Sequence, residues 1–175
     1  DALAIWGQDD GSRYRLWANR YDATSGWGTA APIENGIGFI DNPQIEMDAN
    51  GNGIAIWTQY GSTQGEIWVN RFTAGAWGTA ELLIGTGGNA GAPQIAFDPL
   101  GNAIAVWHQD DGTRDNIWAR HFNVGSSTWG TIQSLESEVG QADGAQIGID
   151  ADGNAVVVWV QNDGSVYNIM ANTYR

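Results

Sequence analysis

The sequence predicts an all-β fold: a β-propeller, or part of one, made of antiparallel four-stranded blades that repeat about every 50 residues. Three observations carry this prediction. The motif Ala-Ile-Trp, Ala-Val-Trp or a close variant recurs, with its tryptophans at Trp6, Trp57, Trp107 and Trp159. The segment before each later copy also repeats, as PQIEMDANGNGIAIW, PQIAFDPLGNAIAVW and AQIGIDADGNAVVVW. Glycine is abundant, with 25 residues, which suits short strands joined by tight turns.

Four strands are expected in each repeat, and the third copy shows them most clearly. From the innermost to the outermost they are 94–98, 103–109, 116–122 and 128–135. Each run is rich in β-branched and aromatic residues and is bounded by Gly, Asn or Asp, which are typical of turns. No helical periodicity competes with this pattern.

The alternation within the strands indicates what each face contacts. In the second strand of the second copy, Ile54 and Ile56 share one face while Ala55 and Trp57 share the other. Because both faces are apolar, we expect this strand to lie between two neighbouring sheets. The innermost strand has one apolar face and one face of small and polar residues, so it is expected beside a wet central axis. Glu46 lies on that polar face, where it would project into the axial channel.

The chain is predicted to be a single repeat domain over 1–175, with repeats at about 1–42, 43–92, 93–144 and 145–175. The first and last repeats are incomplete, so fourteen strands are expected rather than a multiple of four. Open strand edges are templates for further pairing. We therefore expect a homo-oligomer or a part of a longer chain.

The charge balance restricts the partners. The net charge is −13, and all seven basic residues are arginines. Nucleic acid and anionic membrane surfaces are excluded as partners because both require cationic side chains, and no segment is apolar for long enough to insert into a membrane. Without cysteine, no disulfide framework or thiol chemistry is expected. The acidic composition favours a bacterial protein that is secreted or held at the cell surface.

The sequence contains no recognisable catalytic constellation, so we predict that the chain is not an enzyme. It has two histidines, His108 and His121, for which structural or surface roles are expected. No G-x-S-x-G motif is present, and no paired carboxylates stand at matching positions of successive repeats.

Two aspartate-rich turns imitate the first half of a calcium loop, with oxygen ligands at alternate positions. The candidate ligands are Asp48, Asn50, Asn52, Asp150, Asp152 and Asn154. An ordinary hairpin turn, in which the first aspartate accepts backbone N–H groups, explains the same residues. We expect no cofactor, with calcium as the alternative.

The turn pattern P-x-I-x-x-D-x-x-G-N, followed by a hydrophobic strand, resembles the repeat of NHL-type propellers. The order Asp, turn, Gly, hydrophobic strand and Trp also resembles the Asp-box hairpin of sialidase-like propellers. These resemblances imply membership of a broad propeller superfamily and transfer no catalytic residue.

A third resemblance concerns the loops between the second and third strands, which vary most between copies and are where recognition is usually built. A strand ending in Trp-x-Gln, an Asp-Gly loop and a strand opening with Ile-Trp or Leu-Trp resemble the repeats of fucose-binding propeller lectins. In that family, sugars lie between blades against an arginine, a carboxylate and an aromatic ring. The resemblance implies the carbohydrate-binding candidates Arg71, Glu66 and Trp77, joined by Arg20, Trp27 and Trp129 from other copies.

The predicted function is therefore a non-catalytic, lectin-like binding module for a glycan or surface polysaccharide. One alternative is a structural or protein-interaction scaffold in which every tryptophan lies in the core. The other is a fragment of a larger sialidase-like enzyme, whose catalytic residues would come from other blades.

Overall fold

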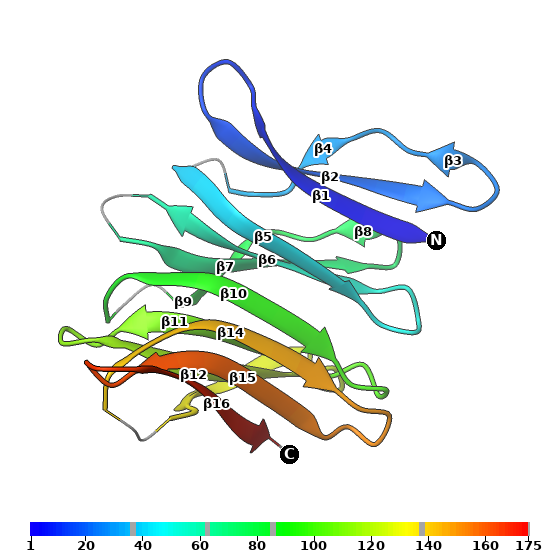
Figure 1. Cartoon of the computed structure of the whole chain (residues 1–175). Coiled ribbons are helices and arrows are strands. Elements are labelled where there is room, and N and C mark those ends of the chain that lie inside the picture. Colours follow the sequence, from blue (N-terminus) through cyan, green and yellow to red (C-terminus); the bar gives the residue numbers. More distant parts are fainter. Residues whose placement is uncertain (36–37, 62–63, 85–86, 137–138, 175) are drawn as a thin grey trace.

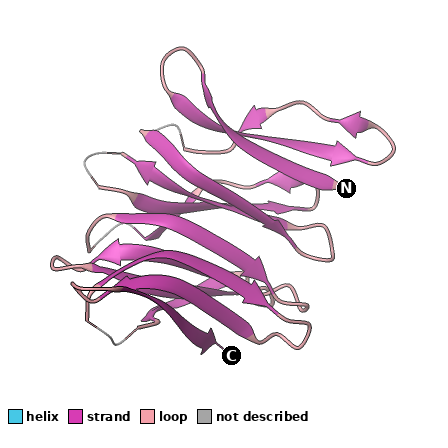
Figure 2. Ribbon diagram, viewed as in Figure 1, coloured by secondary structure: helices cyan, strands magenta, loops and turns pink. Residues whose placement is uncertain are grey.

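The computed structural model describes residues 1–35, 38–61, 64–84, 87–136 and 139–174. These residues form strands and connecting loops, arranged as four antiparallel sheets stacked one on the next (Figures 1 and 2). Within the described residues, no helix has the length and apolar character needed to cross a membrane. The predicted all-β propeller architecture with a repeat of about 50 residues is confirmed.

Each sheet corresponds to one blade. Sheet 1 contains β1 (Ala2–Asp9), β2 (Tyr14–Asp22), β3 (Gly26–Trp27) and β4 (Ala31–Pro32). Sheet 2 contains β5 (Phe39–Met47), β6 (Gly53–Tyr60), β7 (Glu66–Thr73), β8 (Ala76–Trp77) and β9 (Glu81–Ile84). Sheet 3 contains β10 (Ala90–Phe97), β11 (Ala103–Asp110), β12 (Asp115–Asn123) and β13 (Thr128–Ser134). Sheet 4 contains β14 (Gln141–Ile149), β15 (Ala155–Asn162) and β16 (Tyr167–Tyr174).

The sixteen strands occupy the fourteen expected positions, because the outermost strand is split into two short strands in each of sheets 1 and 2. In sheet 1, Trp27 of β3 pairs with Tyr21, whereas Pro32 of β4 pairs with Trp17 of the same strand. The chain leaves the ladder between these pairings. Sheet 2 divides in the same way, into β8 and β9.

The innermost strands are longer than predicted, because each contains a β-bulge near its start. The register shifts between Asp41 and Gln44, between Gly91 and Gln94, and between Asp143 and Gln146. The first bulged residue has a positive φ in each copy: 47° at Asn42, 47° at Ala92 and 66° at Gly144. A strand can thus continue past two unpaired residues without losing its partner.

The core lies between the sheets. The tryptophan face of each later sheet, which carries Trp57, Trp107 or Trp159, packs on the aliphatic face of the sheet before it. Trp57 and Trp107 are fully buried, and Trp159 is nearly so. Burying a side chain of this size contributes a few kcal/mol, so these interfaces account for much of the stability.

Each of these indoles has a polar partner two residues further along the same strand face. The Nε1–H groups of Trp6, Trp57, Trp107 and Trp159 donate to glutamine Oε1 atoms at 3.0, 2.9, 3.3 and 2.8 Å. The repeated Trp-x-Gln pattern is therefore a way of satisfying a buried indole.

The stack has two distinct ends (Figure 1). At the loop end lie the starts of β5, β10 and β14 and the loops that follow β1, β6, β11 and β15. At the turn end lie the hairpins 48–52, 98–102 and 150–154, which join each innermost strand to the next. Sheets 1 and 4 terminate the stack, so the aliphatic face of sheet 4 is open, and Ile169 is 75% exposed there.

Candidate functional site

The aspartate turns proposed as calcium ligands are hairpins closed by their own hydrogen bonds. The Oδ1 atom of Asp48 accepts the backbone N–H groups of Asn50 and Asn52, both at 2.8 Å, while Oδ2 accepts the amide of Asn52 at 2.8 Å. Asp98 and Asp150 make the same three bonds. Burial raises the pKa of Asp48, but the hydrogen bonds from Asn52 and Asn50 outweigh burial, and the net shift is downward.

The same geometry appears where the middle ligand of the calcium pattern is missing, at Leu100. Among the described residues, no group of three or more His, Cys, Asp or Glu side chains has a metal-binding arrangement. The hairpin geometry is thus common to all three copies, and calcium binding at the turns of Asp48 and Asp150, with Asp152 and Asn154 in the latter, stays a prediction.

The structure does not bring together Arg71, Glu66 and Trp77. Glu66 is the first residue of β7 and Arg71 the sixth, so about 16 Å of extended strand separates them. The Oε2 atom of Glu66 accepts the indole N–H of Trp68 at 3.0 Å. Arg71 lies instead with its guanidinium carbon 5.2 Å from the ring centre of Phe122 in sheet 3, an inter-sheet cation–π contact.

The three tryptophans of the outer strands each pair with an aromatic residue across the sheet. The ring centres of Tyr21 and Trp27, of Phe72 and Trp77, and of Phe122 and Trp129 lie 5.4, 5.4 and 5.3 Å apart. Trp77 and Trp129 also pack against the inter-sheet clusters, whereas Trp27, at the open face of sheet 1, is 57% exposed. Packing therefore covers Trp77 and Trp129 in part, and Trp27 is the most exposed of the three.

The remaining candidates lie at the turn end. Arg20 forms an ion pair with Asp1 at 2.6 Å and a longer one with Asp22 at 3.6 Å. Glu46 lines a shallow axial cavity of about 250 Å³ where the turns of Asp48 and Asp98 converge. Phe97 also lines this cavity, and it packs partly buried against the cluster between sheets 2 and 3.

Three of the loops at the opposite end share one turn, although their sequences vary between copies. Asp10 Oδ1 accepts the backbone N–H groups of Ser12 and Arg13 and the hydroxyl of Ser12, at 2.9, 3.0 and 2.6 Å. Asp111 and Asp163 make equivalent bonds. The hydrogen bonds from Ser12 lower the pKa of Asp10 to about 2. These three loops therefore close with the same hydrogen bonds, and the residues that flank them carry the differences between copies.

Three aromatic side chains meet at the loop end, at the contact between sheets 1 and 2. The ring centres of Tyr14 and Phe39 lie 5.4 Å apart in a stacked arrangement, and Tyr60 follows 6.3 Å from Phe39. Tyr14 and Phe39 are 40% and 51% exposed. The Tyr14 ring lies against the backbone of Gly7, where a Cβ would come within 2.3 Å of it. We call Tyr14, Phe39 and Tyr60 the aromatic ladder.

Carboxylates lie along the same end of the neighbouring innermost strands. Asp41, next to the bulge of β5, is close enough to Tyr60 to add to the increase in the tyrosine pKa that burial causes. At the matching position of β14, Asp143 Oδ1 lies 2.8 Å from Nδ1 of His108 in sheet 3. Gly91 occupies that position in β10, and its missing side chain leaves room for the imidazole.

Asp115 completes this acidic group. It is the first residue of β12, and its backbone N–H donates to Gln141 of sheet 4 at 2.5 Å. Burial raises the pKa of Asp115; the charge of His108 opposes this shift, and Asp110 and Asp143 add to it. The loop end thus combines exposed rings with carboxyl groups in different electrostatic environments.

The sequence contained a signal for the aromatic ladder: two of its residues differ from their counterparts in the other copies of the repeat. Position 60 is a tyrosine, whereas the matching residues of the later copies are Asp110 and Asn162. Phe39 likewise stands where the last copy has Gln141. Inter-sheet packing explains what recurs, so a residue that differs from its copies and is exposed is a better marker of function than a recurring tryptophan.

No protein-family model matches the chain, and no curated protein sequence matches it. Solved structures do. An endo-arabinase from Bacteroides thetaiotaomicron is similar with a TM-score of 0.53 and 17% identity, over 98% of this chain and 74% of its own. A protein of unknown function from Dyadobacter fermentans has a TM-score of 0.67 and 15% identity, over 98% of this chain and 49% of its own. A thermostable family-43 glycoside hydrolase has a TM-score of 0.56 and 12% identity, over 98% and 69%.

These similarities support the propeller-like fold and not the finer resemblance to NHL-type, Asp-box or fucose-lectin repeats. They also correct one prediction. The expectation that the chain is not an enzyme is contradicted, because two of the similar structures are glycoside-cleaving enzymes by name. That expectation rested on missing sequence motifs, whereas folding can bring together residues such as His108, Asp115 and Asp143 that form no motif.

Proposed function

We propose that this chain binds a glycan at the loop end, with the aromatic ladder as the stacking platform and neighbouring carboxylates as hydrogen-bond acceptors. The observation that carries the proposal is the exposure of Tyr14 and Phe39 as a stacked pair at that end, where Asp41 also lies. The acidic composition supports a glycan met outside a bacterial cell, either free or as a surface polysaccharide.

The chemistry of a sugar matches these two features. A sugar ring presents apolar C–H groups on its faces, which pack against aromatic rings, and hydroxyl groups around its edge, which donate to carboxylates. Such sites combine apolar walls with a few placed polar groups. The names of the similar endo-arabinase and family-43 glycoside hydrolase support carbohydrate as the ligand class.

Isothermal titration calorimetry with a panel of neutral oligosaccharides, arabino-oligosaccharides included, tests this proposal. We expect one panel member to bind, and Phe39→Ala or Tyr14→Ala to weaken binding at least tenfold, which is about 1.4 kcal/mol. Trp27→Ala is the matched control, since Trp27 is also exposed but lies at the turn end.

Two results would contradict the proposal. One is that no panel member binds to the folded chain. The other is that Trp27→Ala removes binding while Phe39→Ala leaves it intact, which would favour the tryptophans of the outer strands instead. A protein-interaction scaffold would give the first result.

Glycoside cleavage at the same end is the second candidate function, favoured by one observation. Asp115 has a pKa raised by burial and lies within electrostatic reach of Asp143. Carboxyl groups whose environments separate their pKa values are what acid–base glycoside hydrolysis requires. Release of reducing ends from a bound polysaccharide, lost in both Asp115→Asn and Asp143→Asn, would support cleavage. Release that persists in both variants would exclude these residues.

We also propose that the open faces of sheets 1 and 4 associate with further blades, in a second copy or in a longer chain. Every internal interface pairs an aliphatic face with a tryptophan face, and sheet 4 leaves its aliphatic face open at Val156, Val158 and Ile169. Sedimentation of the 175-residue chain should show self-association that Ile169→Asp reduces. A single monomeric species for the unaltered chain at micromolar concentration would contradict association between copies.

A further inference from the structure

A second site lies at the turn end, between sheets 3 and 4, and it can be understood by comparing it with the same place between sheets 2 and 3. Each of these two niches is bounded on one side by the Asp-x-x-Gly-Asn turn and by a side chain of the third strand. That side chain is Arg71 in the first niche and His121 in the second. The two residues are equivalent, because Arg71 pairs with Ile54 and His121 with Ile104.

The other side of each niche carries an aromatic residue, Phe122 in the first and Tyr174 in the second. These two are also equivalent, since they pair with the matching residues Ala103 and Ala155. The niches therefore share a design and differ at three aligned lining positions: arginine against histidine, phenylalanine against tyrosine, and Phe97 against Ile149. Val124 and Ser127 line the first niche only.

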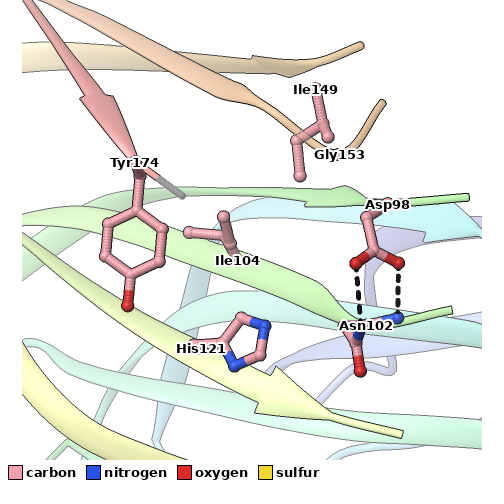
Figure 3. A pocket seen from close by; sticks show the side chains of 7 residues that line it. All are labelled: Asp98, Asn102, Ile104, His121, Ile149, Gly153 and Tyr174. Carbon is pink, nitrogen blue, oxygen red and sulfur yellow. Dashed lines mark hydrogen bonds between the residues drawn. The ribbon is translucent and has the colours of Figure 1, made fainter. Parts of the chain in front are cut away.

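The space left open in the two niches differs as well. Between sheets 2 and 3, the Arg71 guanidinium lies over the Phe122 ring at 5.2 Å, and a cavity of about 80 Å³ remains. Between sheets 3 and 4, where His121 stands for Arg71 and Ile149 for Phe97, the cavity is about 200 Å³ and is bordered by the nearly parallel rings of His121 and Tyr174. Figure 3 shows the lining residues arranged around this open space.

The lining groups offer both kinds of contact that a small polar ring needs. Ile104 and Ile149 form apolar walls, and Tyr174 adds an aromatic one (Figure 3). His121 and the Tyr174 hydroxyl make no hydrogen bond to any residue that the structure describes, so they can bond to a ligand. The Asp98 carboxylate, held in place by Asn102, can accept a further hydroxyl through a free lone pair.

The charge and the size of the cavity define the ligand class. The carboxylate of Asp98 and the overall charge of −13 disfavour anions. A cavity of about 200 Å³ suits one ring better than a longer oligosaccharide. We infer that this cavity, the sheet 3–sheet 4 niche, binds a single neutral sugar ring, either free or at the end of a glycan. The inference does not rest on the loop-end site.

The repeat itself supplies the variants that test this inference. His121→Arg should fill the cavity as Arg71 fills its own niche, and Tyr174→Phe should remove one hydrogen-bonding group while the ring is kept. The reverse change, Arg71→His, should open a second niche between sheets 2 and 3.

The measurement is saturation-transfer and ¹H–¹⁵N correlation NMR, with free L-arabinose, D-xylose and D-galactose as probes. We expect one of these sugars to shift the signals of the sheet 3–sheet 4 niche, with affinity reduced at least tenfold in His121→Arg and less in Tyr174→Phe. Tyr14→Ala, at the loop end, should leave these shifts unchanged, so a failure of the loop-end proposal remains distinguishable.

Three outcomes would overturn the inference. None of the three sugars shifts the niche signals, or His121→Arg binds as the unaltered chain does, or the shifts disappear in Tyr14→Ala and not in His121→Arg. Should His121→Arg fail to fold, which its melting temperature would reveal, Tyr174→Phe takes its place: unchanged affinity in that variant would then overturn the inference.

Discussion

Single aspartate residues close the hairpins at the turn end. In each of the turns at Asp48, Asp98 and Asp150, one carboxylate accepts two backbone N–H groups and an asparagine amide. These bonds satisfy groups that would otherwise need water, and they hold the glycine of each turn at a positive φ, such as 82° at Gly51.

Because these carboxylates are already bonded, removal of divalent metal should not change the stability of the chain. We predict the same melting temperature in EDTA and in excess calcium, measured by circular dichroism. A melting temperature several degrees higher in calcium would show that Asp48, Asn50 and Asn52, or Asp150, Asp152 and Asn154, do bind the ion.

Glu34 and Glu136 occupy equivalent positions, because the residues before them bond through their N–H groups to the matching carbonyls of Leu16 and Ile117. The two glutamates should nevertheless respond oppositely to the same substitution. Glu34 lies 2.6 Å from the Nε atom of Arg15 and its side chain is 4% exposed, so Glu34→Gln removes a buried ion pair. Burial raises the pKa of Glu136, and the charge of Arg114 opposes this shift without cancelling it. At neutral pH, we expect Glu34→Gln to lower the free energy of unfolding by about 1 kcal/mol and Glu136→Gln to raise it.

The pH dependence follows from the direction of the Glu136 shift. A carboxyl group whose pKa is raised on folding destabilises the folded state when ionised, and this penalty disappears as the pH falls through the folded pKa. The increase in the free energy of unfolding caused by Glu136→Gln should therefore become smaller between pH 7 and pH 4, as urea unfolding at each pH would show. A benefit that is constant with pH would contradict this assignment.

At the scale of the strand, the β-bulges store strain that one substitution can relieve. Ala92 has a φ of 47°, a left-handed conformation that costs a residue with a side chain about 1–2 kcal/mol, and the matching residue in the next copy is Gly144. Ala92→Gly should raise the free energy of unfolding by about 0.5–1 kcal/mol, after the added entropy of the unfolded chain is subtracted.

Ala96→Gly is the control for this prediction, because Ala96 lies beyond the bulge in the regularly paired part of β10. The free energy of unfolding of that variant should be lower by about 0.5–1 kcal/mol. Equal destabilisation by both substitutions, measured by urea unfolding, would mean that Ala92 is not strained.

The strands themselves were predictable and the bulges were not. Alternation in 103–109 and 116–122 places β11 and β12 to within a residue at each end, because burial on both faces fixes the pattern. The expected innermost strand, 94–98, missed the residues before the bulge, since Ala92 and Pro93 interrupt both the alternation and the ladder. The division of the outermost strand into β8 and β9 left no mark in the pattern either.

At the scale of the whole molecule, the site depended on how the sheets stack. The sequence placed Arg71, Glu66 and Trp77 in one group because they belong to one repeat, yet Arg71 reaches Phe122 of the next sheet. Tyr14 and Phe39 belong to different repeats and stack only because sheets 1 and 2 are neighbours. Residues that act across blades cannot be identified from spacing within one blade.

The central claim, that a glycan lies on the aromatic ladder, is tested most directly by a crystal structure of the chain soaked with the oligosaccharide that binds most tightly. The account predicts electron density for a sugar ring stacked on Phe39 or Tyr14, with a hydroxyl group within hydrogen-bond distance of Asp41. A sugar bound only against Trp27, or only at the turn end, would contradict it.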